Sequence, residues 1–338
     1  MSLRLSLLDQ SPIFEGETPT EALAHTIELA RWAERLGYYR FWVSEHHDSS
    51  QVVGTSPEVL IAHLLAKTET IRIGSGGVML QHYSPFKVAE NFNVLAALAP
   101  GRVDLGIGRA PGGLPHSTRA LQGEGAAPRP LAEKLAELDQ YLHNRLEESH
   151  PLYGVRANPV VPKPAGLHLL GTTAESGKLA GEFGVPYVFA LFINGDEDVA
   201  EEAIRAYRER FRPVRSAAPE PIVAVSVVVA ETEEAARRIA SDFQLVKIHL
   251  ESGRTITVSS LQHAQEIGRQ TAERYTFEVK DANIIAGTKE TVRRKLLSLQ
   301  ERFGIGEAIL TAPARDFADR VRSIRLLREA FSEASVDG

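Results

Sequence analysis

The chain of 338 residues contains no cysteine and no run of eighteen consecutive apolar residues. Without cysteine it can form no disulfide, thiolate nucleophile, cysteine-ligated zinc site or iron–sulfur cluster. Without a long apolar run, no membrane-spanning helix is expected. Residues 1–10 also lack the basic stretch and apolar run of a signal peptide. We therefore expect a cytoplasmic protein with no membrane partner.

Positive charge is also in short supply. The formal net charge is -6, and no basic run falls on a single predicted element, which argues against a nucleic-acid partner. The hydrophobic fraction of 43% and the charged fraction of 24% are typical of soluble globular proteins. A large core and a small-molecule ligand are therefore expected.

Eight short apolar segments alternate with segments of helical periodicity along the chain. This alternation predicts an α/β fold, a (β/α)8 TIM barrel with loop insertions at its C-terminal face, and the rival is a doubly wound open sheet. No long linker divides the chain, so we expect a single domain over residues 1–338. The predicted strand and helix pairs are 3–8 with 18–36, 39–44 with 57–67, 71–80 with 85–98, 103–107 with 131–147, 168–170 with 174–183, 187–191 with 196–211, 222–230 with a helix from 233, and 308–311 with 315–331.

Three connections exceed the usual loop length: residues 110–130, 149–167 and roughly 250–286. The first follows strand four and the third follows strand seven, so both are expected at the mouth of the barrel, where active sites of this fold are built. The third is the predicted lid.

The second predicted strand ends abruptly in four polar residues, Glu45, His46, His47 and Asp48. Imidazole titrates near neutral pH and can transfer protons, although a strand end that is simply hydrated remains an alternative. A metal site is disfavoured because adjacent histidines on a strand point to opposite faces and no HExxH pattern occurs.

Glycine is concentrated in the third predicted strand, at Gly74, Gly76 and Gly77. Bare backbone inside a buried strand permits close approach by a planar ligand, and a bulge that only shapes the barrel is equally compatible with this pattern.

The fourth strand ends in Gly106, Ile107, Gly108 and Arg109. This segment resembles a dinucleotide-binding fingerprint, but Pro111 occupies the third glycine position and no helix begins there, so NAD binding is not supported. The guanidinium of Arg109 suits a phosphate or another anion, with a surface salt bridge as the alternative.

The fifth strand leads into Thr172, Thr173 and Ser176, around the start of a helix near Ala174. Hydroxyl groups and free N–H groups at a helix N-terminus form an anion site. Capping of the helix explains the same residues without a ligand, and the two interpretations are compatible.

Together these segments resemble the bacterial luciferase-like flavin monooxygenases, a family of (β/α)8 barrels. The similarity is strong over residues 3–113, moderate over 168–230 and weak in the long loops. It is carried by residues 41–47 (FWVSEHH), 62–77 (AHLLAKTETIRIGSGG), 84–90 (SPFKVAE) and 100–109 (PGRVDLGIGR).

The resemblance implies roles for the strand ends. His46 corresponds to the family's catalytic histidine and Glu45 to its acidic neighbour beside the flavin. Gly76 and Gly77 occupy the position of a non-prolyl cis peptide beneath the isoalloxazine ring.

The resemblance also implies that Arg109, Thr172, Thr173 and Ser176 bind the flavin phosphate. Light-emitting members carry a reactive cysteine where this chain has Gly108, which puts light emission in doubt.

The implied activity is oxygenation of a small aldehyde-like or ketone-like substrate by reduced FMN and O2, with the reduced FMN supplied by a separate flavin reductase. Family members dimerise through the helices predicted at 57–67 and 85–98, which are rich in apolar residues, so a homodimer is expected. Three alternatives stay open: a deazaflavin-dependent hydride transfer, a non-catalytic luciferase-like subunit, and a barrel enzyme for sugar phosphates.

Overall fold

Eight parallel strands close into a barrel in the computed structural model, which describes residues 2–110, 112–123, 129–253, 255–271 and 273–332. The strands follow one another around the barrel in chain order, and pairing of β7 with both β6 and β12 closes it. The predicted (β/α)8 barrel is confirmed. Its strands are β1 (Arg4–Asp9), β2 (Arg40–Val43), β3 (Arg72–Met79), β4 (Val103–Gly108), β5 (Gly166–Gly171), β6 (Tyr187–Ala190), β7 (Pro221–Val229) and β12 (Glu307–Thr311).

Both faces of these strands are buried, which explains why they read as nearly continuous apolar runs. In β7, Val223, Val225 and Val227 pack outward against the helices, whereas Ile222 and Ala224 point into the barrel. Alternate residues of each strand therefore fill the barrel in layers.

Helices cover the outside of the barrel, and most begin and end close to the predicted positions. The first has a capping box between Thr18 and Glu21. One predicted end is wrong, because the helix that begins at Leu131 ends at Leu142 and not at residue 147. The helices are α1 (Pro19–Arg35), α2 (Pro57–Lys67), α3 (Pro85–Leu98), α5 (Leu131–Leu142), α6 (Ala174–Phe183), α8 (Glu197–Arg210), α11 (Lys289–Phe303) and α12 (Phe317–Ser332).

The sequence prediction missed α11, the helix that leads into the last barrel strand. It assigned a helix from residue 233 to this place, but that helix, α9 (Glu233–Ala240), is only a short element of the insertion after β7. The signal for α11 was present, since Val292, Leu296, Leu299 and Phe303 recur at helical spacing and are buried.

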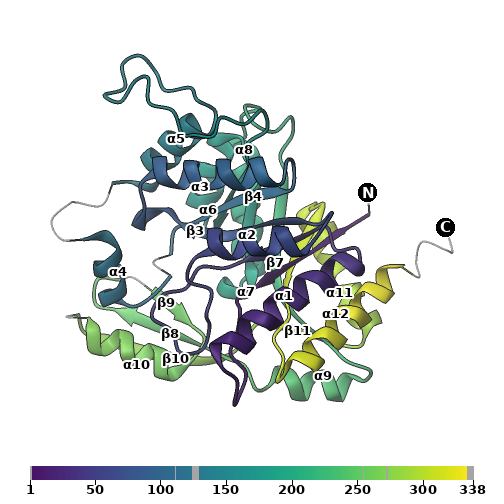
Figure 1. Cartoon of the computed structure of the whole chain (residues 1–338). Coiled ribbons are helices and arrows are strands. Elements are labelled where there is room, and N and C mark those ends of the chain that lie inside the picture. Colours follow the sequence, from purple (N-terminus) through teal and green to yellow (C-terminus); the bar gives the residue numbers. More distant parts are fainter. Residues whose placement is uncertain (1, 111, 124–128, 254, 272, 333–338) are drawn as a thin grey trace.

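The third long connection is not a loop. It contains two of the three strands of an antiparallel sheet in the order β10-β8-β9, and a helix that packs on that sheet (Figure 1). It also contains a strand that pairs in parallel with the C-terminal end of β7. The helix contributes Ala264 and Ile267 to an apolar cluster with β8, and this cluster also includes Leu114 from the first long connection. These elements are β8 (Gln244–Leu250), β9 (Thr255–Val258), α10 (Leu261–Gln270), β10 (Tyr275–Asp281) and β11 (Ile284–Gly287).

The other two long connections lie at opposite ends of the barrel. The first follows β4 at the C-terminal mouth and contains α4 (Pro115–Gln122), whereas residues 149–165 precede β5 and so lie at the N-terminal end. Residues 111, 124–128, 254 and 272 of the predicted loops are outside the described residues. Within the described ranges, no helix has the length and apolar character needed to cross a membrane.

Charged side chains fill the barrel interior at its N-terminal end. Arg40 donates to Asp104 Oδ2 at 2.9 Å and to Glu307 Oε2 at 3.0 Å, and it lies 3.0 Å from His168 Nε2. Trp42 Nε1 donates to the same Asp104 oxygen at 3.1 Å. All five side chains are buried, so this network is closed to ligands.

Candidate active site

The C-terminal mouth of the barrel has a floor of apolar side chains bordered by bare backbone. Leu8 and Trp42 belong to the apolar layer inside the barrel. A Cβ atom added to Gly76 would lie 2.8 Å from Leu8 Cδ1 and 2.9 Å from Trp42 Cε3, and one added to Gly106 would lie 2.3 Å from Ser75 O. Close packing against Leu8, Trp42 and the backbone of β3 therefore requires glycine at both positions.

The peptide bond between Gly76 and Gly77 is cis, as the resemblance implied. The pairing register between β3 and β4 also shifts between Ser75 and Val78. The bulge considered in the sequence analysis is therefore present.

His46 lies just beyond the end of β2 and is held in place on two sides. Its backbone N–H donates to Gly54 O at 2.8 Å, and its Nδ1 lies 3.0 Å from Ser44 Oγ. Burial lowers its pKa to about 4, with smaller contributions from the charges of His263 and His47. His46 is therefore neutral near pH 7, and its Nε2 has no hydrogen-bond partner among the described residues. A neutral imidazole in this position can accept or donate a proton.

Glu45 is fully buried, and both of its carboxylate oxygens are occupied. Oε1 accepts a hydrogen bond from the Tyr83 hydroxyl at 2.7 Å and lies 2.8 Å from His47 Nε2, and Oε2 accepts from Met79 N at 3.0 Å. Burial, followed by the bond to Glu45, raises the pKa of Tyr83. This carboxylate therefore links the loop after β2 to the end of β3.

Arg109 is exposed at the end of β4 and has no hydrogen bond or ion pair with any part of the chain that the structure describes. The surface salt bridge considered as an alternative for Arg109 therefore has no acidic partner among the described residues. Ile107 pairs with Leu169 across β4 and β5. Arg109 follows β4 at the end of the barrel where Thr172 follows β5.

The start of α6 shows the capping arrangement considered in the sequence analysis. Thr173 Oγ1 accepts from Ser176 N at 3.3 Å, and Ser176 Oγ donates to Thr173 O at 2.7 Å. The N–H groups of Ala174 and Glu175 and the hydroxyl of Thr172 have no hydrogen-bond partner within the described ranges. These three groups remain available to an anion.

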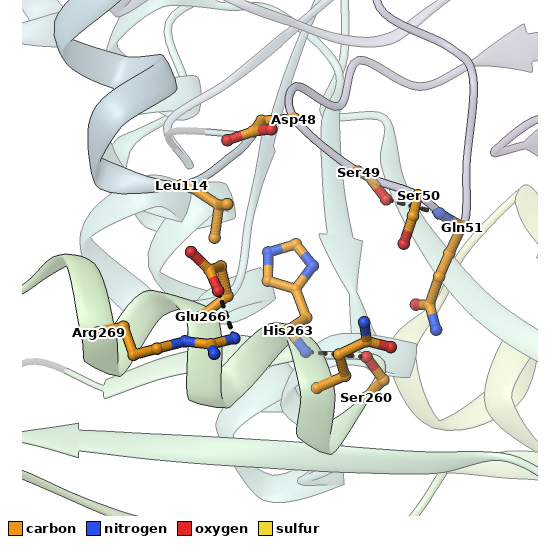
Figure 2. Close-up of a pocket in the computed structure, with 10 residues that line it drawn as sticks. Asp48, Ser49, Ser50, Gln51, Leu114, Ser260, His263, Glu266 and Arg269 are labelled. Atoms are coloured by element: carbon orange, nitrogen blue, oxygen red, sulfur yellow. Dashed lines mark hydrogen bonds and ion pairs between the residues drawn. The ribbon is translucent and has the colours of Figure 1, made fainter.

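The sequence analysis missed His263, which α10 brings to the mouth. A pocket of about 100 Å³ lies between α10 and the loop after β2 (Figure 2). His263 points into it from α10, and Asp48 faces it from the loop (Figure 2). A lone histidine in a long connection gave no signal that could have identified it.

Comparison with known proteins identifies the family. The sequence profile described as luciferase-like monooxygenase matches residues 3–335. The chain belongs to the luciferase-like monooxygenase family. It is similar to N-acetyl-S-alkylcysteine monooxygenase from Bacillus subtilis (strain 168), with 43% identity over 98% of this chain and 99% of that protein. The crystal structure of apo-MsnO8 is also similar, with a TM-score of 0.80 and 34% identity over 98% of each chain.

Other solved luciferase-like barrels share the fold and carry different cofactors. The oxygenating constituent of 3,6-diketocamphane monooxygenase, in complex with FMN, has a TM-score of 0.68 at 18% identity over 98% of each chain. An F420-dependent secondary alcohol dehydrogenase has a TM-score of 0.62 at 17% identity over 98% of each chain. Membership of this family makes the chain an oxidoreductase of the monooxygenase class.

Proposed function

We propose that this luciferase-like monooxygenase uses reduced FMN and O2 to oxygenate a small organic substrate at the C-terminal mouth of the barrel. The observation that carries the proposal is that the Arg109 guanidinium, with no partner among the described residues, and the free N–H groups at the start of α6 lie at the same end of the barrel as the irregular Gly76–Gly77 segment of β3. A phosphate fits the first feature and a flat ring system fits the second.

Reduced FMN would supply the two electrons that activate O2, and the residues of the chain would bind the flavin, move protons and exclude water. Arg109, Thr172 and the start of α6 would hold the phosphate, while the backbone of Gly76 and Gly77 would support the ring. Thr173 and Ser176 would contribute by holding the α6 N-terminus in shape.

His46 would hold and move a proton at Nε2, because Ser44 occupies its other nitrogen. Glu45 would keep the loop that carries His46 in place. The apolar floor formed by Leu8 and Trp42 would exclude water from below the reacting atoms.

For the substrate, the similarity to N-acetyl-S-alkylcysteine monooxygenase favours an N-acylated amino acid with a thioether over the aldehyde or ketone expected from the sequence. One atom of O2 enters the substrate, and the other leaves as water with the two electrons of the reduced flavin and two protons.

The test combines the protein with reduced FMN and N-acetyl-S-methylcysteine without oxygen, then admits air and quantifies oxygenated product. We expect product from the wild type and at least about a hundredfold less from His46→Ala, the lower end of the range for loss of a general acid or base. No binding of either redox state of FMN would contradict the proposal and make a deazaflavin the next ligand to test. Binding without any turnover would favour the non-catalytic alternative.

We also propose that residues 1–338 form one domain of a cytoplasmic homodimer that receives reduced FMN from a separate reductase. Most apolar residues of α2 and α3, among them Ile61, Leu64 and Phe92, are buried in the core and do not support a dimer surface. Val59 and Leu98 do, because they are 68% and 69% exposed. Light scattering that gives only a monomer would contradict the dimer.

A further inference from the structure

Helix α10 has two faces with different tasks. Its apolar face, which includes Ala264 and Ile267, packs on the small antiparallel sheet. Ser260, the N-cap of α10, and His263 and Glu266 on the side adjoining the apolar face all line the pocket (Figure 2). The sheet thus supports α10 so that these polar residues line the pocket.

Two contacts hold α10 over the barrel loops. Ser259 Oγ donates to Gln51 Oε1 at 3.3 Å, which joins the start of α10 to the loop after β2. At the other end, His116 N donates to Gln270 Oε1 at 3.0 Å and joins α10 to α4. The pocket between them is therefore part of the folded structure.

Two functional groups in the pocket lack partners. The imidazole of His263 and the carboxylate of Asp48 make no hydrogen bond or ion pair with any residue that the structure describes. Glu266 and Arg269, in contrast, are paired with each other. Burial lowers the pKa of His263 against the opposing charges of Asp48 and Glu266, so the ring is neutral near pH 7 and offers one N–H donor.

We propose that Asp48 and His263 recognise a secondary amide of the substrate, with Asp48 accepting its N–H and His263 donating to its carbonyl oxygen. This inference rests on the proposed function and names the residues that would select a substrate with an amide group. A carboxylate would be repelled by Asp48, whereas an ammonium group would leave the His263 donor unused. A secondary amide offers an N–H to Asp48 and a carbonyl oxygen to His263.

The position of the pocket supports the same assignment. Asp48 is two residues from His46 on one loop, so a head group bound here would leave the remainder of the molecule near the reacting centre. A pocket of about 100 Å³ holds such a head group but not a whole substrate. His263 also lies close enough to His46 for a positive charge on its ring, when protonated, to lower the pKa of His46.

The test compares kcat/KM for an N-acetyl thioether with that for its O-acetyl ester analogue, which keeps the carbonyl group and lacks the N–H. We expect the wild type to prefer the amide at least about tenfold, since the ester offers no N–H to the Asp48 carboxylate and places an oxygen lone pair against it instead. Asp48→Gly should bring this ratio close to one. Glycine is the suitable replacement because Asp48 has a φ of 53°.

The second half of the test addresses the carbonyl group. His263→Leu should lower kcat/KM about tenfold for both acylated compounds and leave the corresponding thioether without an acyl group unaffected. Gln265→Leu, at an exposed position on the same helix, is the matched control and should change neither value. Oxidation of bound reduced FMN in air should be the same in all variants.

An amide to ester ratio near one in the wild type, or the wild-type ratio retained in Asp48→Gly, would overturn the inference. If no compound is oxygenated, the proposed function fails separately. Calorimetric affinities of the protein for the amide and the ester then decide the inference by the same ratio, and equal affinities would overturn it.

Discussion

The two arginines at opposite ends of the barrel, Arg40 and Arg109, differ in whether they have partners within the protein. At the N-terminal end Arg40, Asp104, Glu307 and His168 bond to one another and are buried. At the C-terminal mouth Arg109 has no partner among the described residues. Polar groups that find partners within the protein contribute to its structure, whereas those without partners are available to ligands.

The same contrast appears in the histidines. His168 is enclosed between Arg40 and the backbone oxygen of Gly166. His46 and His263 each keep a ring nitrogen free of partners in the part of the chain that the structure describes. Proton transfer and substrate recognition require such free positions.

Arg40→Met should have the largest effect on stability. It would leave the carboxylates of Asp104 and Glu307 buried without their main cation, at a cost of about 3–5 kcal/mol in unfolding free energy. Urea unfolding measures this cost. Arg109→Met is the matched control at the other end, and it should change the unfolding free energy by no more than about 0.5 kcal/mol. Equal effects would remove the distinction between the two ends.

Gly106→Ala should destabilise the protein by about 1–3 kcal/mol. The new Cβ would lie 2.3 Å from the backbone oxygen of Ser75, which cannot move independently. Gly108→Ala is the control, because its Cβ would meet only the flexible side chain of Met79, at 3.3 Å. Similar melting temperatures for the two variants would show that the bare backbone at Gly106 is not required.

The barrel and the location of its site were predictable because both depend on local patterns. Alternating apolar and helical segments indicate the barrel, and polar residues at strand ends such as His46 and Arg109 indicate the site. The N-terminal network was not predictable, since Arg40 and Glu307 are 267 residues apart in the sequence.

The insertion was also beyond sequence reasoning, for a physical reason. All seven residues of β10 are exposed, so the strand lacks the alternation of buried and exposed residues that identifies a half-buried strand. Its pairing with β8 therefore gave no local signal, and the place of His263 depends on that pairing. The inward turn of Glu45 likewise depends on Tyr83 and Met79, which belong to another part of the barrel.

Acid should weaken the protein through His168. Burial, followed by the charge of Arg40, lowers its pKa to about 4. A histidine with a lowered pKa takes up its proton first in the unfolded chain, so stability falls as the pH drops from about 6.5 toward 4. We expect a loss of roughly 1–2 kcal/mol at pH 5 from this residue. Urea unfolding of His168→Asn at pH 7 and pH 5 should show a smaller difference than the wild type, and an equal difference would contradict this origin.

Arg109→Met should weaken binding of reduced FMN by about ten to a hundredfold, the effect of losing a charged hydrogen bond to phosphate. Thr172→Val should have a smaller effect in the same direction, because a neutral hydroxyl contributes less. Riboflavin, which lacks the phosphate, should bind the wild type and Arg109→Met equally. A loss of riboflavin binding in Arg109→Met would show that the guanidinium acts on another part of the flavin.

The most direct test of the account is an anaerobic calorimetric titration of the wild type, Arg109→Met and Arg40→Met with reduced FMN, under conditions in which all three are folded. The account predicts that the wild type and Arg40→Met bind with similar affinity and that Arg109→Met binds at least about tenfold more weakly. Equal affinity in all three proteins, or no binding to the wild type, would contradict the assignment of the C-terminal mouth as the flavin site.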